Sequence, residues 1–192
     1  MSPDGQTIAA SSRGGVVKLW DVNGVLLDTL VAHQGGVKTM AFSPDSQMLA
    51  TGSEDHTVKL WTLQANQPPM LVHTLNSHDG EVLGLAFSPD GQTLASASQD
   101  GTVKLWDNQG VLLSTLNGHN GPVRKVAFSP DGQTLATASE DQSVILWNIP
   151  QVLDQDQLLR QGCAWVQNYL HNYPQMSDSD QAICEGFNLK ND

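Results

Sequence analysis

Three sets of four polar or aromatic residues recur along the chain at the same spacing. In each set a His is followed by a Ser or Thr, then by an Asp and finally by a Trp. The sets are His33, Thr51, Asp55 and Trp61; His78, Ser96, Asp100 and Trp106; and His119, Thr137, Asp141 and Trp147. A hydroxyl, an imidazole and a carboxylate in contact are the groups of a hydrolytic triad. Because one active site needs only one triad, the threefold recurrence, each time with a Trp, favours a structural role over hydrolysis.

Other patterns of catalysis or ligand binding are missing from the sequence. The chain has two cysteines, Cys163 and Cys184, and they form neither a CxxC motif nor a Cys/His pair at zinc-ligand spacing. Buried thiols are favoured over a disulfide between them. The glycines lie at turns and do not form a phosphate-binding loop. We therefore expect no catalytic residue, no metal ion and no cofactor.

The three sets belong to a longer repeat. Residues 88–106, SPDGQTLASASQDGTVKLW, return with few changes at 43–61 and 129–147, and in an altered form at 2–20. The matching tryptophans at positions 20, 61, 106 and 147 are 41, 45 and 41 residues apart. Recurrence at this period indicates stacked supersecondary units.

The local pattern within each repeat is that of β-strands. Ser-Pro-Asp-Gly at 88–91 suits a tight turn, and small and polar residues alternate over 94–98. A returning strand follows at 103–106, and 111–116 reads as an outer strand. The uneven apolar spacing within 82–87 predicts a β-bulge in the preceding strand. Each unit is therefore expected to be a four-stranded antiparallel meander.

These features together resemble the WD-repeat family of β-propellers over residues 2–148. A Gly-His pair, the Ser-Pro-Asp-Gly turn, a Ser/Thr-containing strand, an Asp in a tight turn and Lys-Leu-Trp-Asp recur in phase. The resemblance implies an all-β fold, a partial propeller of four-stranded antiparallel blades with three complete repeats and one that lacks its inner strand. It also implies that each set forms a buried hydrogen-bond chain from Asp through His and Ser/Thr to the indole N–H.

The repeats predict a propeller domain over 1–149 and a different segment over 150–192. Units are expected at about 2–32, 33–77, 78–118 and 119–149. In the first unit Ala10 and Gly14 replace the Ser/Thr and the Asp, so Trp20 should lack polar partners. The segment 150–192 is predicted to be a short helical C-terminal extension. Its apolar residues at helical spacing are Leu158, Leu159, Cys163, Val166, Tyr169, Leu170 and Tyr173.

The second unit carries a four-residue insertion within 64–72 that contains Pro68 and Pro69. Proline lacks an N–H and cannot donate to a strand ladder, so this segment should form a loop at the propeller rim. A tolerated loop insertion is favoured over a peptide-docking feature.

The charge balance limits the class of partner. Twenty acidic residues against nine Lys and Arg give a net charge of −11. Nucleic-acid phosphates and anionic membranes would repel such a chain. No apolar run approaches the roughly 20 residues of a membrane-spanning helix, and no signal peptide is recognisable. With cysteines this scarce, a reducing compartment is favoured, and we expect a cytoplasmic protein.

The resemblance implies a non-catalytic scaffold for protein–protein interaction. The chain is similar to the C-terminal portion of bacterial, cyanobacterial-type WD-repeat proteins. One alternative is the sensor propeller of a multidomain bacterial signalling ATPase, and a less favoured one is a hydrolase that uses one His/Ser/Asp set. An arc of four units leaves two blade faces uncovered, so we expect part of a longer chain or a homo-oligomer that completes a ring.

A protein or peptide partner is expected at one rim of the propeller. In the family the loop before the inner strand and the Asp-containing turn face the same rim. The variable residues there are Lys38, Glu54, Glu81, Gln99, Arg124 and Glu140. An ordinary solvated rim is the alternative for any one of them.

Overall fold

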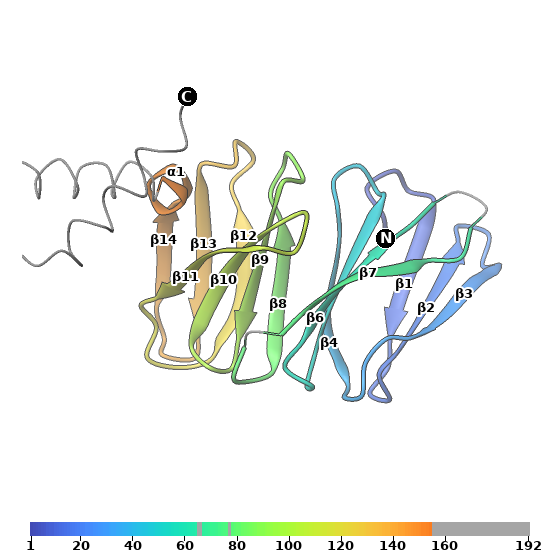
Figure 1. The fold of residues 1–192 in the computed structure, drawn as a ribbon, viewed down its shortest axis with the longest axis horizontal. Helices are drawn as coiled ribbons and strands as arrows, with labels where there is room; N and C mark the ends of the chain where they lie inside the picture. The colour runs from blue at the N-terminus through green and yellow to red at the C-terminus, as the bar shows by residue number, and fades with distance from the viewer. Residues whose placement is uncertain (65–66, 77, 155–192) are drawn as a thin grey trace, which may run out of the picture. The chain divides into compact units, whose positions relative to one another are not determined.

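The computed structural model describes residues 1–64, 67–76 and 78–154 of the chain. These residues form four antiparallel β-sheets that follow one another in chain order, then a short helix (Figure 1). Met1–Ile149 is one structural unit. From residue 155 onward, the predicted helical extension and both cysteines lie outside the described residues.

Each sheet is a meander of strands that are consecutive in the sequence. Sheet 1 contains β1 (Thr7–Ser11), β2 (Val16–Asp21) and β3 (Leu26–Val31). Sheet 2 contains β4 (Val37–Phe42), β5 (Met48–Ser53), β6 (Val58–Thr62) and β7 (Met70–Leu75). Sheet 3 contains β8 (Val82–Phe87), β9 (Thr93–Ser98), β10 (Thr102–Asp107) and β11 (Leu112–Asn117). Sheet 4 contains β12 (Val123–Phe128), β13 (Thr134–Ser139) and β14 (Val144–Asn148), and α1 (Ile149–Leu153) follows.

The sheets confirm the predicted all-β fold, a partial propeller. Sheets 2 and 3 have four strands each. Within the described residues sheet 1 has three strands, which correspond to the second, third and outer strands of sheet 2. Sheet 4 also has three within the described residues, because the chain passes from β14 directly into α1.

The turns explain why the repeat contains Ser-Pro-Asp-Gly. In sheet 3 the Ser88 hydroxyl donates to Asp90 Oδ1 at 2.6 Å and accepts the N–H of Thr93 at 2.9 Å. Gly91 has a φ of 71°, in the left-handed region that favours glycine. In sheet 2 Ser46 takes this position with a φ of 61°. The turn geometry is therefore kept even where the glycine is replaced.

The predicted bulge is present in all three inner strands. The pairing register with the second strand shifts between Val37 and Thr39, between Val82 and Gly84, and in sheet 4 between Val123 and Lys125. Each shift adds one residue to the inner strand and re-aims the side chains near its start.

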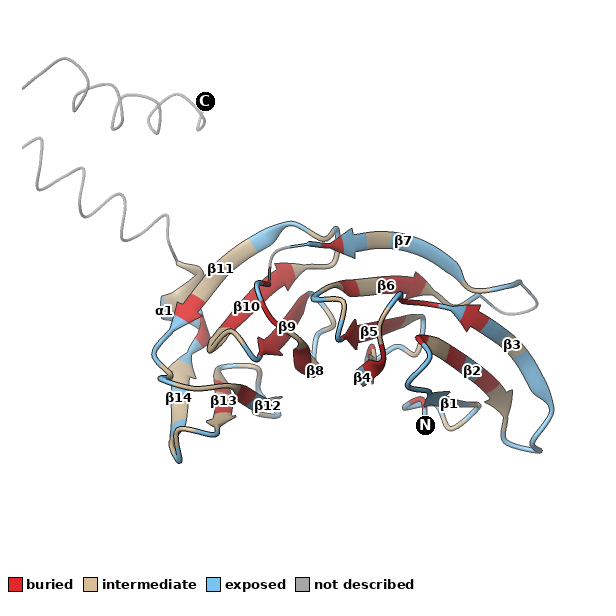
Figure 2. Cartoon of the chain, turned by 90° about the horizontal axis from the view of Figure 1, so that it is seen from below, coloured by how far each residue is buried: buried red, intermediate tan, exposed pale blue. Residues whose placement is uncertain are grey.

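The core lies between successive sheets, which stack face to face. We call the side of a sheet that meets the next sheet its forward face, and the opposite side its reverse face. Leu60, on the forward face of sheet 2, packs in one cluster with Leu94 and Trp106 on the reverse face of sheet 3. Figure 2 shows buried residues concentrated in β5, β6, β9 and β10, the central strands of the two middle sheets. Burial of a strand therefore depends on a sheet on either side of it.

The contact between sheets 2 and 3 is especially close at Gly52. A Cβ atom there would lie 2.6 Å from Cγ1 of Val82 and 2.8 Å from Cγ2 of Thr39. Ala97 and Ala138 occupy the same position in sheets 3 and 4. The missing methyl of Gly52 thus gives room to the fully buried Val82 of the neighbouring sheet.

Candidate functional site

Strands β9 and β10 and the loop before β8 bring the second predicted set together. His78 Nε2 is 2.8 Å from Ser96 Oγ, and His78 Nδ1 is 2.9 Å from Asp100 Oδ2. The indole N–H of Trp106 donates to Ser96 Oγ at 2.8 Å. Ser96 and Trp106 meet because they lie on paired, adjacent strands, while the Asp stands in the turn that joins these strands.

The other two sets have nearly the same geometry. His33 is 2.8 Å from Thr51 Oγ1 and 2.9 Å from Asp55 Oδ2, and the Trp61 indole donates to Thr51 at 3.1 Å. In sheet 4 the corresponding distances are 2.8, 3.0 and 3.0 Å, for the pairs His119–Thr137, His119–Asp141 and Trp147–Thr137. The structure therefore brings the four residues of each predicted set together, in three separate sheets.

The hydrogen-bonding capacity of the groups fixes the direction of each chain. A carboxylate only accepts, so Nδ1 of the imidazole must carry the proton. Nε2 then accepts from the Ser or Thr hydroxyl, whose oxygen in turn accepts the indole N–H. Each carboxylate also accepts the backbone N–H of the residue after the His, at 3.1 Å from Gln34, 3.0 Å from Asp79 and 2.9 Å from Asn120. Each set therefore ties the loop before an inner strand to its own sheet.

The ionisation of these groups follows from their surroundings. Burial lowers the pKa of His33 and of His78 below the ordinary value of 6.5, although the neighbouring Asp opposes this shift. Burial alone would raise the pKa of Asp55, but hydrogen bonds from Thr57 and the charge of His33 lower it to about 2. Asp100 likewise has a pKa of about 2. Near neutral pH, His33 and His78 are thus neutral imidazoles that face ionised carboxylates.

The hydroxyl of each set is poorly placed to act as a nucleophile. Thr51 and Ser96 are fully buried, and Thr137 is 1% exposed. Each hydroxyl oxygen is also occupied by an imidazole and an indole. A substrate carbonyl needs an open approach to the attacking oxygen, and this geometry closes that approach.

Sheet 1 lacks such a chain. Ala10 and Gly14 offer no side-chain donor or acceptor, and among the described residues the indole of Trp20 makes no hydrogen bond to protein. Trp20 is also less buried than Trp61 or Trp106.

The predicted rim residues lie at the start of the inner strands and in the turns beside them, and most are paired. Lys38 Nζ is 2.6 Å from Glu54 Oε1 and 3.5 Å from Glu81 Oε2 of the next sheet. Arg124 Nε donates to Glu140 Oε1 at 2.7 Å. We call the surface formed by the predicted residues the charged rim; its members are Lys38, Glu54, Glu81, Gln99, Arg124 and Glu140. The ion pair within one sheet could have been found by aligning the repeats. Sheets 2 and 4 carry a cation and a Glu at these two positions, whereas sheet 3 carries the uncharged Leu83 and Gln99.

Comparison with known families gives the identity of the repeat. The family model described as WD domain, G-beta repeat matches residues 1–21, 24–62, 69–107 and 110–148. The chain belongs to the WD-repeat family. No curated protein matches the chain.

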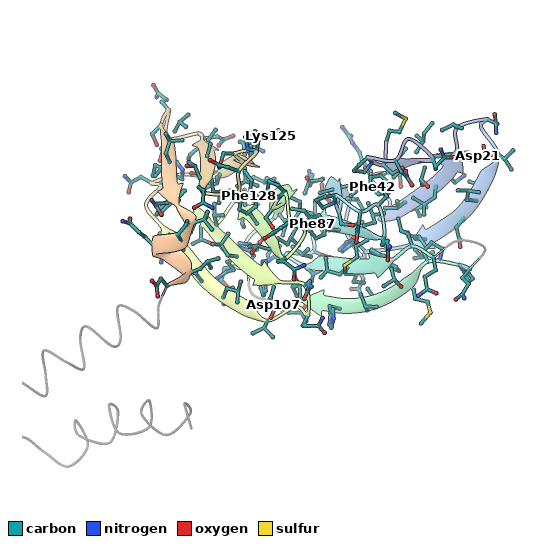
Figure 3. The ribbon with its side chains drawn as sticks, turned by 90° about the horizontal axis from the view of Figure 1, so that it is seen from above. Asp21, Phe42, Phe87, Asp107, Lys125 and Phe128 are labelled. Atoms are coloured by element: carbon teal, nitrogen blue, oxygen red, sulfur yellow. The ribbon has the colours of Figure 1, made fainter. Side chains whose placement is uncertain are left out.

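The inner strands of these WD repeats line one side of the sheets. Figure 3 shows Phe42, Phe87 and Phe128 on this inner side, with Lys125 beside them, and Asp21 and Asp107 toward the outer strands. Asp107, which follows the Trp of its repeat, accepts the backbone N–H groups of Gln109 and Val111 at 2.9 and 2.8 Å. The Trp-Asp pair therefore links a core aromatic side chain to a turn-forming carboxylate.

The insertion in the second WD repeat shapes a surface hollow. Pro68 and Pro69 lie just before β7 and line a cavity of about 940 Å³, together with Asp4, Leu27 and Asp45. This places the proline pair in a loop, as predicted.

Within residues 1–64, 67–76 and 78–154, no cluster of three His, Cys, Asp or Glu side chains could hold a metal ion. In the same part of the chain, none of the helices is long and apolar enough to cross a membrane.

Proposed function

We propose that this chain is a non-catalytic scaffold that binds a protein or peptide partner at the charged rim. Proteins built of WD repeats generally mediate protein interactions, which supports the proposal. The low cysteine content of the repeats suits the cytoplasm as the place of action.

The observation that carries the proposal is the contrast between the charged rim and the three buried sets. The sets have exposed fractions of only a few per cent at His33 and His78, and their hydrogen bonds are directed inward. On the rim the side chains of Lys38 and Glu54 are 38% and 40% exposed, and those of Arg124 and Glu140 are 54% and 48% exposed. The backbone that carries these charges belongs to paired strands and the turns beside them.

The partner must compete with the ion pairs of the charged rim. Exposed pairs of this kind contribute about 0–1 kcal/mol, so opening one costs little free energy. A partner that offers its own acidic and basic groups at matching positions can replace them. Rim charges of this type mainly set specificity and association rate.

The test uses peptides selected from a random library for binding to the folded protein. Lys38→Gln and Arg124→Gln remove one rim charge each without creating repulsion between like charges. We expect at least a tenfold loss of peptide affinity in the double variant, with an unchanged circular dichroism spectrum. Gln92→Glu is the control, because it alters charge at the Ser-Pro-Asp-Gly turn of sheet 3, at the opposite end of β8. Peptides that bind the rim double variant as well as the unaltered protein would place the partner surface elsewhere.

We also propose that a second copy of the chain covers the free faces of sheets 1 and 4. Among the described residues these are the two sheets with a neighbour on one side only. Oligomers that close upon themselves in this way are common among repeat and symmetric proteins.

A further inference from the structure

The cavity beside the insertion lies between sheets 1 and 2, at a position where sheets 2 and 3 are in close contact. In sheet 3 the short turn between β10 and β11 packs onto β7 of sheet 2. A Cβ atom at Gly110 in this turn would lie 3.0 Å from Leu75 Cδ2 and 3.1 Å from His73 Cγ. Sheet 2 carries the four-residue insertion in place of this short turn. The open space of about 940 Å³ therefore accompanies a local departure of one repeat from the others.

The floor of this cavity is apolar. Leu19 belongs to the core cluster between sheets 1 and 2, and Leu63, just before the insertion, packs against that cluster. Leu27 of β3 lines the cavity and is 55% exposed, and Pro69 lines it as well. A ligand that removes this apolar surface from water would gain free energy by doing so.

Three carboxylates stand around the apolar floor, those of Asp4, Asp28 and Asp45. None of the described lining residues is a Lys, Arg or His, and the three carboxylates form no ion pair within the described part of the chain. Hydrogen bonds from the Ser2 and Ser43 hydroxyls lower the pKa of Asp4 and of Asp45, so both are ionised near neutral pH. On the charged rim, by contrast, each Glu has a Lys or Arg partner. We call this site the acidic hollow; its members are Asp4, Leu27, Asp28, Asp45, Leu63 and Pro69.

Asp28 distinguishes the acidic hollow from the next junction. Asp28, His73 and Ser114 hold the same position in the outer strands of sheets 1, 2 and 3, as their pairing with the neighbouring strands shows. Of the three, only Asp28 is a carboxylate, and it lies beside the open space. The negative charge and the cavity therefore occur together.

We propose that the acidic hollow binds a peptide segment in which an arginine stands next to apolar side chains. The negative potential of the carboxylates attracts the guanidinium, and the apolar neighbours cover Leu27, Leu63 and Pro69. Arginine suits the site because its several N–H donors can serve more than one carboxylate at once.

The size and position of the acidic hollow suit a peptide. Its volume is at the upper end of the range of about 300–1,000 Å³ for ligand sites, which is more than one side chain needs. Proteins built of WD repeats generally mediate protein interactions, which favours a protein-derived ligand. Asp45 follows the end of β4, whereas Lys38 of the charged rim stands at its start, so the two sites lie at opposite ends of the sheets. The acidic hollow does not depend on the function proposed for the rim.

The first test selects a phage-displayed random peptide library on the folded full chain. Leu27→Arg serves for counter-selection, because it places a cation of the chain itself beside the carboxylates and blocks the hollow. Asp28→Asn takes its place if circular dichroism shows that Leu27→Arg is not folded. We expect the peptides that survive counter-selection to carry an arginine beside apolar residues. A selection without survivors, or survivors without a basic residue, overturns the proposal.

The second test measures the affinity of a surviving peptide by isothermal titration calorimetry. Asp28→Asn removes one charge but keeps the oxygen that accepts the Thr29 N–H at 2.6 Å, and we expect it to weaken binding about tenfold. Asp79→Asn is the control, because it removes the same charge at an exposed residue outside the hollow and should keep the affinity. Equal affinities for these two variants would contradict the proposal.

The apolar part of the acidic hollow has its own matched pair of variants. Leu27→Ala should weaken binding of the same peptide several-fold, because it removes apolar contact surface. Val72→Ala changes the same repeat position in sheet 2, where Val72 is 38% exposed and does not line the cavity, and it should leave the affinity unchanged. Equal effects of the two changes would show that the peptide does not contact Leu27.

The acidic hollow and the charged rim are distinguished by exchanging their variants. Lys38→Gln with Arg124→Gln should keep the affinity for the hollow peptide, and Asp28→Asn should keep the affinity for the rim peptides. A hollow peptide that loses affinity in the rim double variant binds at the rim, and this result would overturn its assignment to the hollow.

Discussion

At the scale of single residues, the most constrained groups are the three imidazoles, each of which joins a loop carboxylate to a strand hydroxyl. His78 is 7% exposed and has hydrogen bonds of 2.8 and 2.9 Å to Ser96 and Asp100. Both ring nitrogens are used, so no smaller side chain can replace the imidazole without leaving Ser96 or Asp100 short of a partner.

His78→Ala should therefore destabilise the protein by about 1–3 kcal/mol, the cost of leaving buried polar groups unsatisfied. The measurement is the midpoint of urea unfolding. Gln99→Ala, an exposed change in the adjacent turn, is the control and should stay within about 0.5 kcal/mol of the unaltered chain. Equal midpoints for both variants would contradict a stabilising role of the set.

Acidification should lower the stability in two stages. The pKa values of His33 and His78 are depressed, so below about pH 6.5 the unfolded chain binds protons that the folded chain resists. The pKa of Asp55 and of Asp100 is about 2 against an ordinary 3.8, so their contribution is present above about pH 4 and is lost as the pH falls toward 2. Melting temperatures from pH 7 to pH 2 test this. In His78→Gln the first stage should be smaller, and a melting temperature that rises between pH 7 and pH 5 would show the sign to be wrong.

At the scale of strands and turns, the sequence predicted most of what is observed. The repeated Ser-Pro-Asp-Gly turns and Trp positions were enough to predict the order of the strands. This is because the turn residues and the alternating strand pattern lie close together in the sequence of each repeat. The bulge beginning at Val82 was also readable, from apolar spacing alone. The ion pair between Lys38 and Glu81 could not be predicted, because it joins two successive sheets and depends on how their inner strands are offset.

Gly52 shows where comparison of the repeats misleads. Ala97 occupies the same position in sheet 3, so the alignment alone would allow Gly52→Ala, and strand propensity would favour it by about 0.5–1 kcal/mol. The new methyl would meet Val82, which is fully buried and has no space to withdraw.

We expect Gly52→Ala to destabilise the protein by about 1–3 kcal/mol, the usual cost of overpacking. Urea unfolding provides the measurement. Gly14→Ala is the control, because its Cβ would meet only Ser12 Oγ at an ordinary 3.8 Å and no positive φ is involved. A stable Gly52→Ala protein would mean that β5 and β8 can separate at low cost.

At the scale of the whole propeller segment, burial is decided by neighbouring sheets more than by residue type. Leu60 and Leu146 occupy one repeat position, yet the first is fully buried and the second is 68% exposed. Sequence alone makes these two leucines equivalent. What separates them is whether a following sheet covers the position, and this depends on the arrangement of the complete chain or assembly.

Leu60→Ala should cost about 2–5 kcal/mol, as expected for a cavity in a well-packed core. Leu71→Ala, in the outer strand of the same sheet and 45% exposed, should change the stability by much less. Thermal and urea unfolding of the two variants provide the comparison. Similar losses in both would mean that the outer strand, and not the contact between sheets, carries the stability of sheet 2.

The indole hydrogen bonds have a further consequence for the timing of local opening. Trp61, Trp106 and Trp147 hold their indole protons in three successive sheets, where they can exchange with deuterium only when that sheet opens. Trp20 makes no such indole hydrogen bond to any residue that the structure describes. The repeats are nearly identical in sequence, yet each of these three sheets carries its own indole N–H as a probe. The order in which the three indole protons exchange therefore reports the order in which the sheets open.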